Sequence, residues 1–217
     1  MPPLPAPLAG ASPTAGKPLS KRERTRGQLI LAAISVFSAN GVAASTMQQV
    51  AAEAGMTTGT VYNHFHSKTE IVAAVARQIA ETIRQRSMGA RATLGSDAEQ
   101  IAAGCRRYLG LARSSPAWAL LILDVASVDP AFRKTITGFV RSELRHGLRS
   151  GEFTVVSEAA GLDLVIGGTM EAMRRIATGE APRNHATVVV AAILRGLGIS
   201  SAAAQRIAAK PLPLFDR

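Results

Sequence analysis

Residues 45–70 read STMQQVAAEAGMTTGTVYNHFHSKTE, and this stretch decides the fold. Ser45 followed by Gln48 predicts a capping box at the start of a helix, because the hydroxyl and the amide can each satisfy one backbone N–H. Small and apolar residues follow at helical spacing, and Gly55 ends the run where a left-handed conformation favours glycine. Thr57 predicts the N-cap of a second, short helix. Two helices joined by a glycine turn are typical of a helix-turn-helix.

An ordinary helical hairpin fits the same local pattern, so the outer face of the second helix has to separate the two interpretations. This face has no acidic and no large aliphatic residue. Short hydroxyls and an amide suit base edges, and a glycine lets the backbone approach closely. Tyrosine, histidine and lysine suit phosphate oxygens. The face comprises Thr57, Thr58, Gly59, Thr60, Tyr62, Asn63 and His64, with Lys68 just beyond. Its chemistry favours a DNA-reading helix.

A basic segment precedes this region. It holds four basic residues and one acidic residue, Glu23, and we expect it to form an arm along a phosphate backbone or in a minor groove. Its basic residues are Lys21, Arg22, Arg24 and Arg26.

A longer pattern extends over residues 22–80, about a quarter of the chain. Its residues are Arg26, Ala33, Phe37, Gly41, Thr46, Val50, Ala51, Ala54-Gly55-Met56, Gly59-Thr60-Val61-Tyr62, His64-Phe65 and Ser67-Lys68. This pattern resembles the TetR family of transcriptional regulators. The resemblance implies a three-helix DNA-binding domain in which residues 57–65 form the recognition helix.

The resemblance also implies roles for individual residues. Those facing bases would be Gln48, Thr58, Gly59, Thr60 and Asn63, and those holding phosphates would be Thr46, Tyr62, His64 and Lys68. Met47 departs from the family, because a threonine often contacts phosphate at this position. The first residues of the recognition helix vary widely in the family, so they do not predict the operator sequence.

The rest of the chain predicts an all-α protein. We expect a disordered tail over 1–19 without secretory-signal features, a helix-turn-helix DNA-binding domain over 20–80, and a helical ligand-binding and dimerisation domain over 81–217, reached through a connecting helix. Ser-Ser-Pro and Asp-Pro sequences are helix start signals. They predict helices over 116–127 and 130–150, after one over 97–113. The only hint of a strand is Phe153–Val156.

Charge and cysteine content limit the classes of protein. The net charge is +10, but residues 20–80 hold only six basic and three acidic groups, whereas 81–217 hold eighteen and twelve. Most of the excess therefore fits solvated arginine-rich faces better than a second DNA contact. The single cysteine, Cys105, excludes an internal disulfide and is expected to be a buried apolar residue. No apolar run suggests a membrane span, and we expect a cytoplasmic protein.

Two late segments, 157–177 and 184–197, are apolar on more than one face, so each needs partners on more than one side. They could be central helices of a monomeric bundle. The alternative is a homodimer interface in which two helices of each subunit form a four-helix bundle. TetR-like proteins dimerise in this way, and two recognition helices about 34 Å apart read a palindrome.

By the same resemblance, the helices over 97–150 enclose a cavity for a small-molecule effector together with the dimer helices. Apolar residues expected to line it are Trp118, Phe132, Phe139, Met170 and Met173, and polar anchors could be Arg141, Arg145 and His146. In the alternative interpretation, the aromatic residues and methionines belong to the core and the arginines to a solvated face.

Nothing in the sequence predicts catalysis. His64 and His66 are alternate residues, so they do not share a helix face, and no Cys or carboxylate cluster completes a metal site. We therefore expect no enzyme activity, no metal and no cofactor. The sequence favours a DNA-binding transcriptional regulator, a repressor released from a palindromic operator by an effector. An architectural DNA-binding protein without an effector response remains the alternative.

Overall fold

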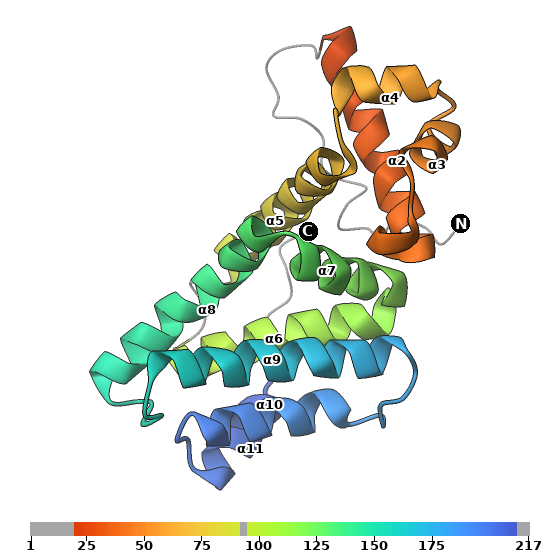
Figure 1. Ribbon diagram of the computed structural model, residues 1–217. Helices are drawn as coiled ribbons and strands as arrows, with labels where there is room; N and C mark the ends of the chain where they lie inside the picture. The colour runs from red at the N-terminus through yellow and green to blue at the C-terminus, as the bar shows by residue number, and fades with distance from the viewer. Residues whose placement is uncertain (1–19, 92–94, 212–217) are drawn as a thin grey trace. The chain divides into compact units, whose positions relative to one another are not determined.

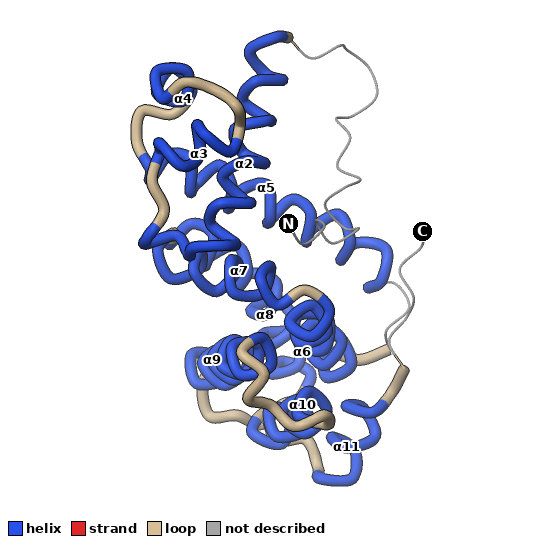
Figure 2. The backbone as a smooth tube through the Cα atoms, turned by 90° about the vertical axis from the view of Figure 1, so that its right-hand side faces the viewer, coloured by secondary structure: helices blue, strands red, loops and turns tan. Residues whose placement is uncertain are grey.

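The computed structural model describes residues 20–91 and 95–211, and side chains of 82–91 are not described. Regular secondary structure in these ranges is entirely helical, which confirms the all-α prediction (Figure 1; Figure 2). The helices are α2 (Lys21–Ala44), α3 (Met47–Glu53), α4 (Thr58–His64), α5 (Lys68–Arg91), α6 (Asp97–Ser114), α7 (Pro116–Val128), α8 (Pro130–Ser150), α9 (Glu158–Ala177), α10 (His185–Gly196) and α11 (Ser201–Ala209). Phe153–Val156 forms no strand and lies in the loop after α8. The tail expected over 1–19 lies outside the described residues.

The chain divides into two compact units. The first runs to Ile83 and also includes Leu121–Phe132, and the second comprises Arg84–Leu120 and the residues from Arg133 onward. Helices α5, α7 and α8 therefore each contribute residues to both units. The segment Leu121–Phe132 joins the first unit although it lies far along the chain.

The first unit is built on α2, which packs against α3, while α3 packs against α4. Leu29 and Phe37 of α2 are buried, as are Val50 of α3 and Val61 of α4. Burying such side chains contributes roughly 1.5–3 kcal/mol each. Phe65, directly after α4, is also fully buried and has the Arg26 guanidinium 4.4 Å from its ring centroid. This packing fixes the short helix α4 on α3, and the contact between Arg26 and Phe65 ties the end of α4 to α2.

Helix α2 differs from the expectation that no apolar segment is long enough to suggest a membrane span. Among the described residues it is the single helix long and apolar enough to cross a membrane by length and composition. Its apolar residues have a different explanation in this fold, because they form the core against α3. The buried ones are Leu29, Ala32, Ala33, Ile34, Val36, Phe37 and Val42.

The second unit is a stack of helices in which α9 packs on α6 and α10 packs on both, while α11 covers α10 and α6 (Figure 1; Figure 2). Cys105 of α6 is buried and its Sγ lies 3.2 Å from Thr169 Oγ1 of α9. Burial raises the pKa of the Cys105 thiol to about 11. The predicted buried, apolar role of Cys105 is confirmed.

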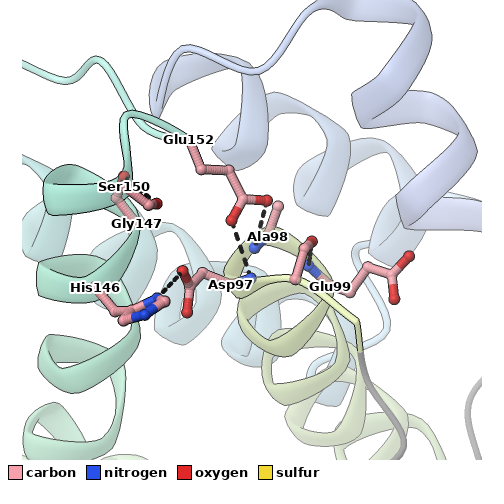
Figure 3. Close-up of polar contacts among 8 residues, drawn as sticks. Asp97, Ala98, Glu99, His146, Gly147, Ser150 and Glu152 are labelled. Carbon is pink, nitrogen blue, oxygen red and sulfur yellow. Dashed lines mark hydrogen bonds and ion pairs between the residues drawn. The ribbon is translucent and has the colours of Figure 1, made fainter.

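The start of α6 is held by a carboxylate from outside the helix, that of Glu152 (Figure 3). Glu152 accepts hydrogen bonds from the backbone N–H groups of Asp97 at 3.0 Å and Ala98 at 3.3 Å. The Asp97 carboxylate in turn lies 2.6 Å from Nδ1 of His146 on α8. Carboxylates satisfy free N–H groups at a helix start and match its positive dipole end. These contacts fix α8 and the following turn against α6.

Candidate DNA interface

The start of α3 differs by one residue from the sequence prediction. Thr46, not Ser45, is the N-cap: its Oγ1 accepts from the Gln49 N–H at 3.2 Å, and Gln49 Oε1 accepts from the Thr46 N–H at 2.8 Å. Ser45 is buried and donates to the Gly41 carbonyl at 2.7 Å. The capping box therefore uses Gln49 and leaves the Gln48 side chain exposed. Thr46 keeps an exposed position at the helix start, although its hydroxyl already caps the helix.

The turn between α3 and α4 matches the local prediction. Gly55 has a φ of 64°, the left-handed conformation in which glycine is favoured. Thr57 caps α4, since its Oγ1 accepts from the Thr60 N–H at 3.2 Å and lies 3.0 Å from Thr60 Oγ1. Two of the hydroxyls predicted for DNA thus also stabilise the start of α4.

Helix α4 separates an apolar inner side from a polar outer side. Val61 is fully buried, whereas Tyr62 is 44% exposed and Asn63 and Gly59 are exposed. Thr58, Thr60 and His64 are half-buried. The side chains of Tyr62 and Asn63 make no hydrogen bond to the described residues, so their polar groups remain available to an external partner.

The two basic side chains predicted to contact phosphate differ in their surroundings. Lys68 is half-buried and its Nζ donates to the Ala43 carbonyl at 2.8 Å, which ties the start of α5 to the end of α2. An ammonium has three donors, so two remain for phosphate. The His64 Nδ1 atom is buried and makes no hydrogen bond to the part of the chain that the structure describes.

The basic segment upstream is not an extended arm, contrary to the prediction. It forms the first turns of α2 behind the N-cap Ser20, whose Oγ accepts from the Glu23 N–H while Glu23 accepts from the Ser20 N–H. Ser-x-x-Glu is a capping-box signal, and the prediction of an arm did not take it into account. Lys21 and Arg22 are exposed at this helix start, whereas Arg26 stacks on Phe65.

The residues expected to line an effector cavity lie in different surroundings. Trp118, Phe132 and Met173 are buried, and Phe139 and Met170 are half-buried. Phe132 belongs to the first unit and the other four belong to the second. The effector cavity therefore stays a prediction.

The three polar groups considered as ligand anchors already have carboxylate partners. Glu158 lies 2.6 Å from Arg145 Nε and 3.1 Å from Arg141 Nε, and His146 contacts Asp97. The hydrogen bond from Arg145 holds the pKa of the Glu158 carboxyl below its usual value. These side chains join α8 to α9 and α6, which gives each of them a structural role.

Two family sequence models match the chain. The model of bacterial regulatory proteins of the tetR family matches residues 29–75, and that of the tetracyclin repressor-like C-terminal domain matches residues 96–210, more than half of the chain. Among curated relatives, the HTH-type transcriptional regulator SrpR of Pseudomonas putida is 46% identical over 61 residues, covering 28% of this chain and 29% of SrpR. The HTH-type transcriptional regulator TtgR, also of Pseudomonas putida, is 42% identical over 60 residues, with shares of 28% and 29%. The matches span less than a third of the length of these relatives.

Solved structures extend the similarity over most of the chain. RolR in complex with resorcinol has a TM-score of 0.72 at 26% identity and covers 90% of this chain and 98% of its own. A TetR-family transcriptional regulator from Pectobacterium atrosepticum has a TM-score of 0.61 at 30% identity, with shares of 83% and 97%.

Proposed function

Because the chain belongs to the TetR family of bacterial regulatory proteins, we propose that it is a sequence-specific DNA-binding transcriptional regulator that works as a cytoplasmic repressor. One observation carries this proposal: α4 is a short helix with a buried apolar side and a polar outer side, on which the exposed side chains of Tyr62 and Asn63 make no hydrogen bond to the described residues. Such a helix can enter a major groove without losing its packing.

The proposed DNA contacts fall into two groups. Direct base contacts come from exposed or half-buried polar groups, and phosphate contacts come from the flanking residues. The base-reading group comprises Gln48, Thr58, Gly59, Thr60 and Asn63, and the phosphate group comprises Thr46, Tyr62, His64 and Lys68. Thr57 belongs to the same interface without an assigned group. The freed Gln48 side chain at the start of α3 supports the first group, and the exposed position of Tyr62 supports the second.

We propose that α9 and α10 form a homodimer interface, as predicted for residues 157–177 and 184–197. The two helices pack closely: a Cβ added to Gly168 would lie 3.3 Å from Ile193, and one added to Gly196 would lie 3.1 Å from Leu164. Leu164 and Val188 remain 42% and 54% exposed. The two helices also expose small residues, namely Ala160, Gly167 and Ala192. Exposed apolar and small residues on two adjacent helices fit a four-helix bundle with a second copy.

The regulatory part of the proposal is an allosteric response to a small-molecule effector. RolR, similar over 90% of this chain, has been solved with resorcinol bound, which supports an effector site in the second unit here. An effector releases the repressor if it binds more tightly to a state whose recognition helices no longer match successive major grooves. A thermal-shift screen of small phenols, apolar acids and amphiphiles at about 100 times their Kd should raise stability by about 2.7 kcal/mol for a true ligand.

The central experiment compares binding to the DNA upstream of the chain's own gene with binding to a scrambled fragment of the same length at physiological salt. We expect a preference of about 1000-fold or more for the upstream DNA. Equal affinity for both fragments would contradict a sequence-specific regulator and favour an architectural DNA-binding protein. Sedimentation at micromolar concentration tests the dimer separately, and a monomer there would contradict the α9–α10 interface.

A further inference from the structure

The junction between α2 and α3 is irregular and has to be held by side chains. Helix α2 is interrupted at Gly41, where φ is 76° and ψ is 156°, and Ser45 is extended before the cap of α3. Backbone groups in such a break lack their helical partners. The position of α3, and with it the polar residues at its start, depends on what fixes this junction.

Three side chains hold the junction at three successive points. Ser45 donates to the Gly41 carbonyl at 2.7 Å, and Lys68 of α5 donates to the Ala43 carbonyl at 2.8 Å. The Val42 N–H donates to the Oδ2 of Asp124 at 3.1 Å. Of these three side chains, Asp124 comes from the most distant part of the chain, because it lies on α7, 82 positions after Val42.

The contact between Asp124 and the junction is close and depends on glycine. A Cβ at Gly41 would lie 3.1 Å from Asp124 Oδ2, and the positive φ at Gly41 is itself strained for other residues. Leu123 and Val125, on either side of Asp124, are 2% and 0% exposed, so their burial fixes the carboxylate. Val42 is 4% exposed, which protects its hydrogen bond from water. A charge-assisted bond in such a setting is among the stronger ones in proteins.

We propose that Asp124 is a positioning residue for DNA recognition: through Val42 it sets the α2–α3 junction and hence the placement of Thr46 and Gln48. This inference rests on the proposed function. Asp124 belongs to the first unit, together with the junction that it contacts. It comes from α7, which begins only at Pro116, far along the chain from the proposed DNA contacts, so the junction is completed only when this distant part of the chain has folded onto it.

The test uses the full chain with Asp124→Ala, Asp124→Asn and the control Glu180→Ala. Glu180 is exposed in the loop after α9, so its removal reproduces the change in net charge without touching the junction. We expect Asp124→Ala to weaken binding to the upstream DNA about tenfold relative to Glu180→Ala, the size expected for one charge-assisted hydrogen bond. Binding to scrambled DNA should weaken only slightly, through the displaced phosphate contact of Thr46, and the salt dependence should not change, because no cationic phosphate contact is lost.

Asp124→Asn keeps the shape of the side chain and an amide oxygen that can accept from the Val42 N–H, so it should recover most of the lost affinity.

Hydrogen exchange of the free protein gives a second readout. The amides of residues 41–50 should exchange about tenfold faster or more in Asp124→Ala, and their exchange rates should be unchanged in Glu180→Ala. If Asp124→Ala matches the control in both readouts, the inference is wrong. If Asp124→Ala does not fold, the results for Asp124→Asn decide. The inference is contradicted if Asp124→Asn binds the upstream DNA with full affinity while its amides at 41–50 exchange faster. It is equally contradicted if affinity falls while the exchange of these amides stays normal. A wild-type protein that does not prefer its upstream DNA refutes the proposed function, while the exchange readout still judges Asp124.

Discussion

The two units of the chain use their polar side chains differently. In the first unit, the side chains of Gln48, Tyr62 and Asn63 are exposed and make no hydrogen bond to the described residues. In the second unit, several polar side chains are paired with each other, as in His146 with Asp97 and Lys210 with Glu99 at 2.8 Å. Unpaired polar groups on a rigid scaffold can bind an external partner, whereas paired ones hold the fold. The difference favours DNA recognition by the first unit.

The largest effect should come from removing the anchor beneath α4. Phe65→Ala deletes a fully buried ring and its contact with Arg26, which costs about 3–5 kcal/mol. We expect a loss of about 100-fold or more in affinity for the upstream DNA, because α4 loses its support. Phe153→Ala makes the same truncation in the second unit, where Phe153 is 2% exposed. At a temperature where both variants are folded, Phe153→Ala should bind within a few-fold of wild type. Equal losses would show that the two units are not separable.

Substitution of a glycine in the second unit should lower stability while leaving DNA affinity nearly unchanged. Gly198 has a φ of 101°, and a Cβ there would overlap the Thr154 hydroxyl and lie 3.0 Å from the Thr154 backbone nitrogen. Gly198→Ala should therefore lower the free energy of unfolding by about 2–4 kcal/mol in urea titrations, with little change in DNA affinity of the folded protein.

Gly138→Ala is the matched control, because Gly138 is exposed on α8 and a Cβ there meets nothing within 4 Å. It should raise stability by up to about 1 kcal/mol through helix propensity. If Gly198→Ala were as stable as Gly138→Ala, the close approach of Thr154 to Gly198 would be wrong.

Local chemistry explains which features the sequence predicted. Gly55 and Thr57 were placed correctly, because a turn and a cap depend on a few neighbouring residues. Helices α9 and α10 begin and end within one residue of the predicted segments, since their apolar runs are long. The candidate base and phosphate contacts remain predictions.

The errors have equally physical causes. Ser45-Thr46 and Gln48-Gln49 are adjacent pairs, so the capping box has two registers, and the hydrogen bond from Ser45 to the Gly41 carbonyl favours one of them. The bond between Val42 and Asp124 joins residues 82 positions apart, and a single sequence carries no periodic or capping signal for such a pair.

The third prediction separates the two kinds of proposed DNA contact within the first unit. Asn63→Ala should cost about 1–3 kcal/mol against the preferred base, relax sequence preference at that position and leave the salt dependence unchanged. Tyr62→Phe removes only the hydroxyl, so it should weaken binding to all sequences slightly and equally. Fluorescence titrations against a set of single-base variants of the upstream DNA make the comparison. An unchanged base profile in Asn63→Ala would remove Asn63 from the base-reading group.

The smallest effect should come from the two neighbouring glutamines, and it tests the register of α3 directly. Gln49→Ala removes one half of the capping box, so it should lower the free energy of unfolding by no more than about 1 kcal/mol and leave base preference intact. Gln48→Ala touches no capping bond, so its stability should match wild type while its base profile changes. Thermal unfolding and the same set of DNA variants distinguish the two substitutions. If instead Gln48→Ala lowered stability and Gln49→Ala changed the base profile, the capping box of α3 would be formed by Ser45 and Gln48. Gln48 would then be a capping residue rather than a base contact.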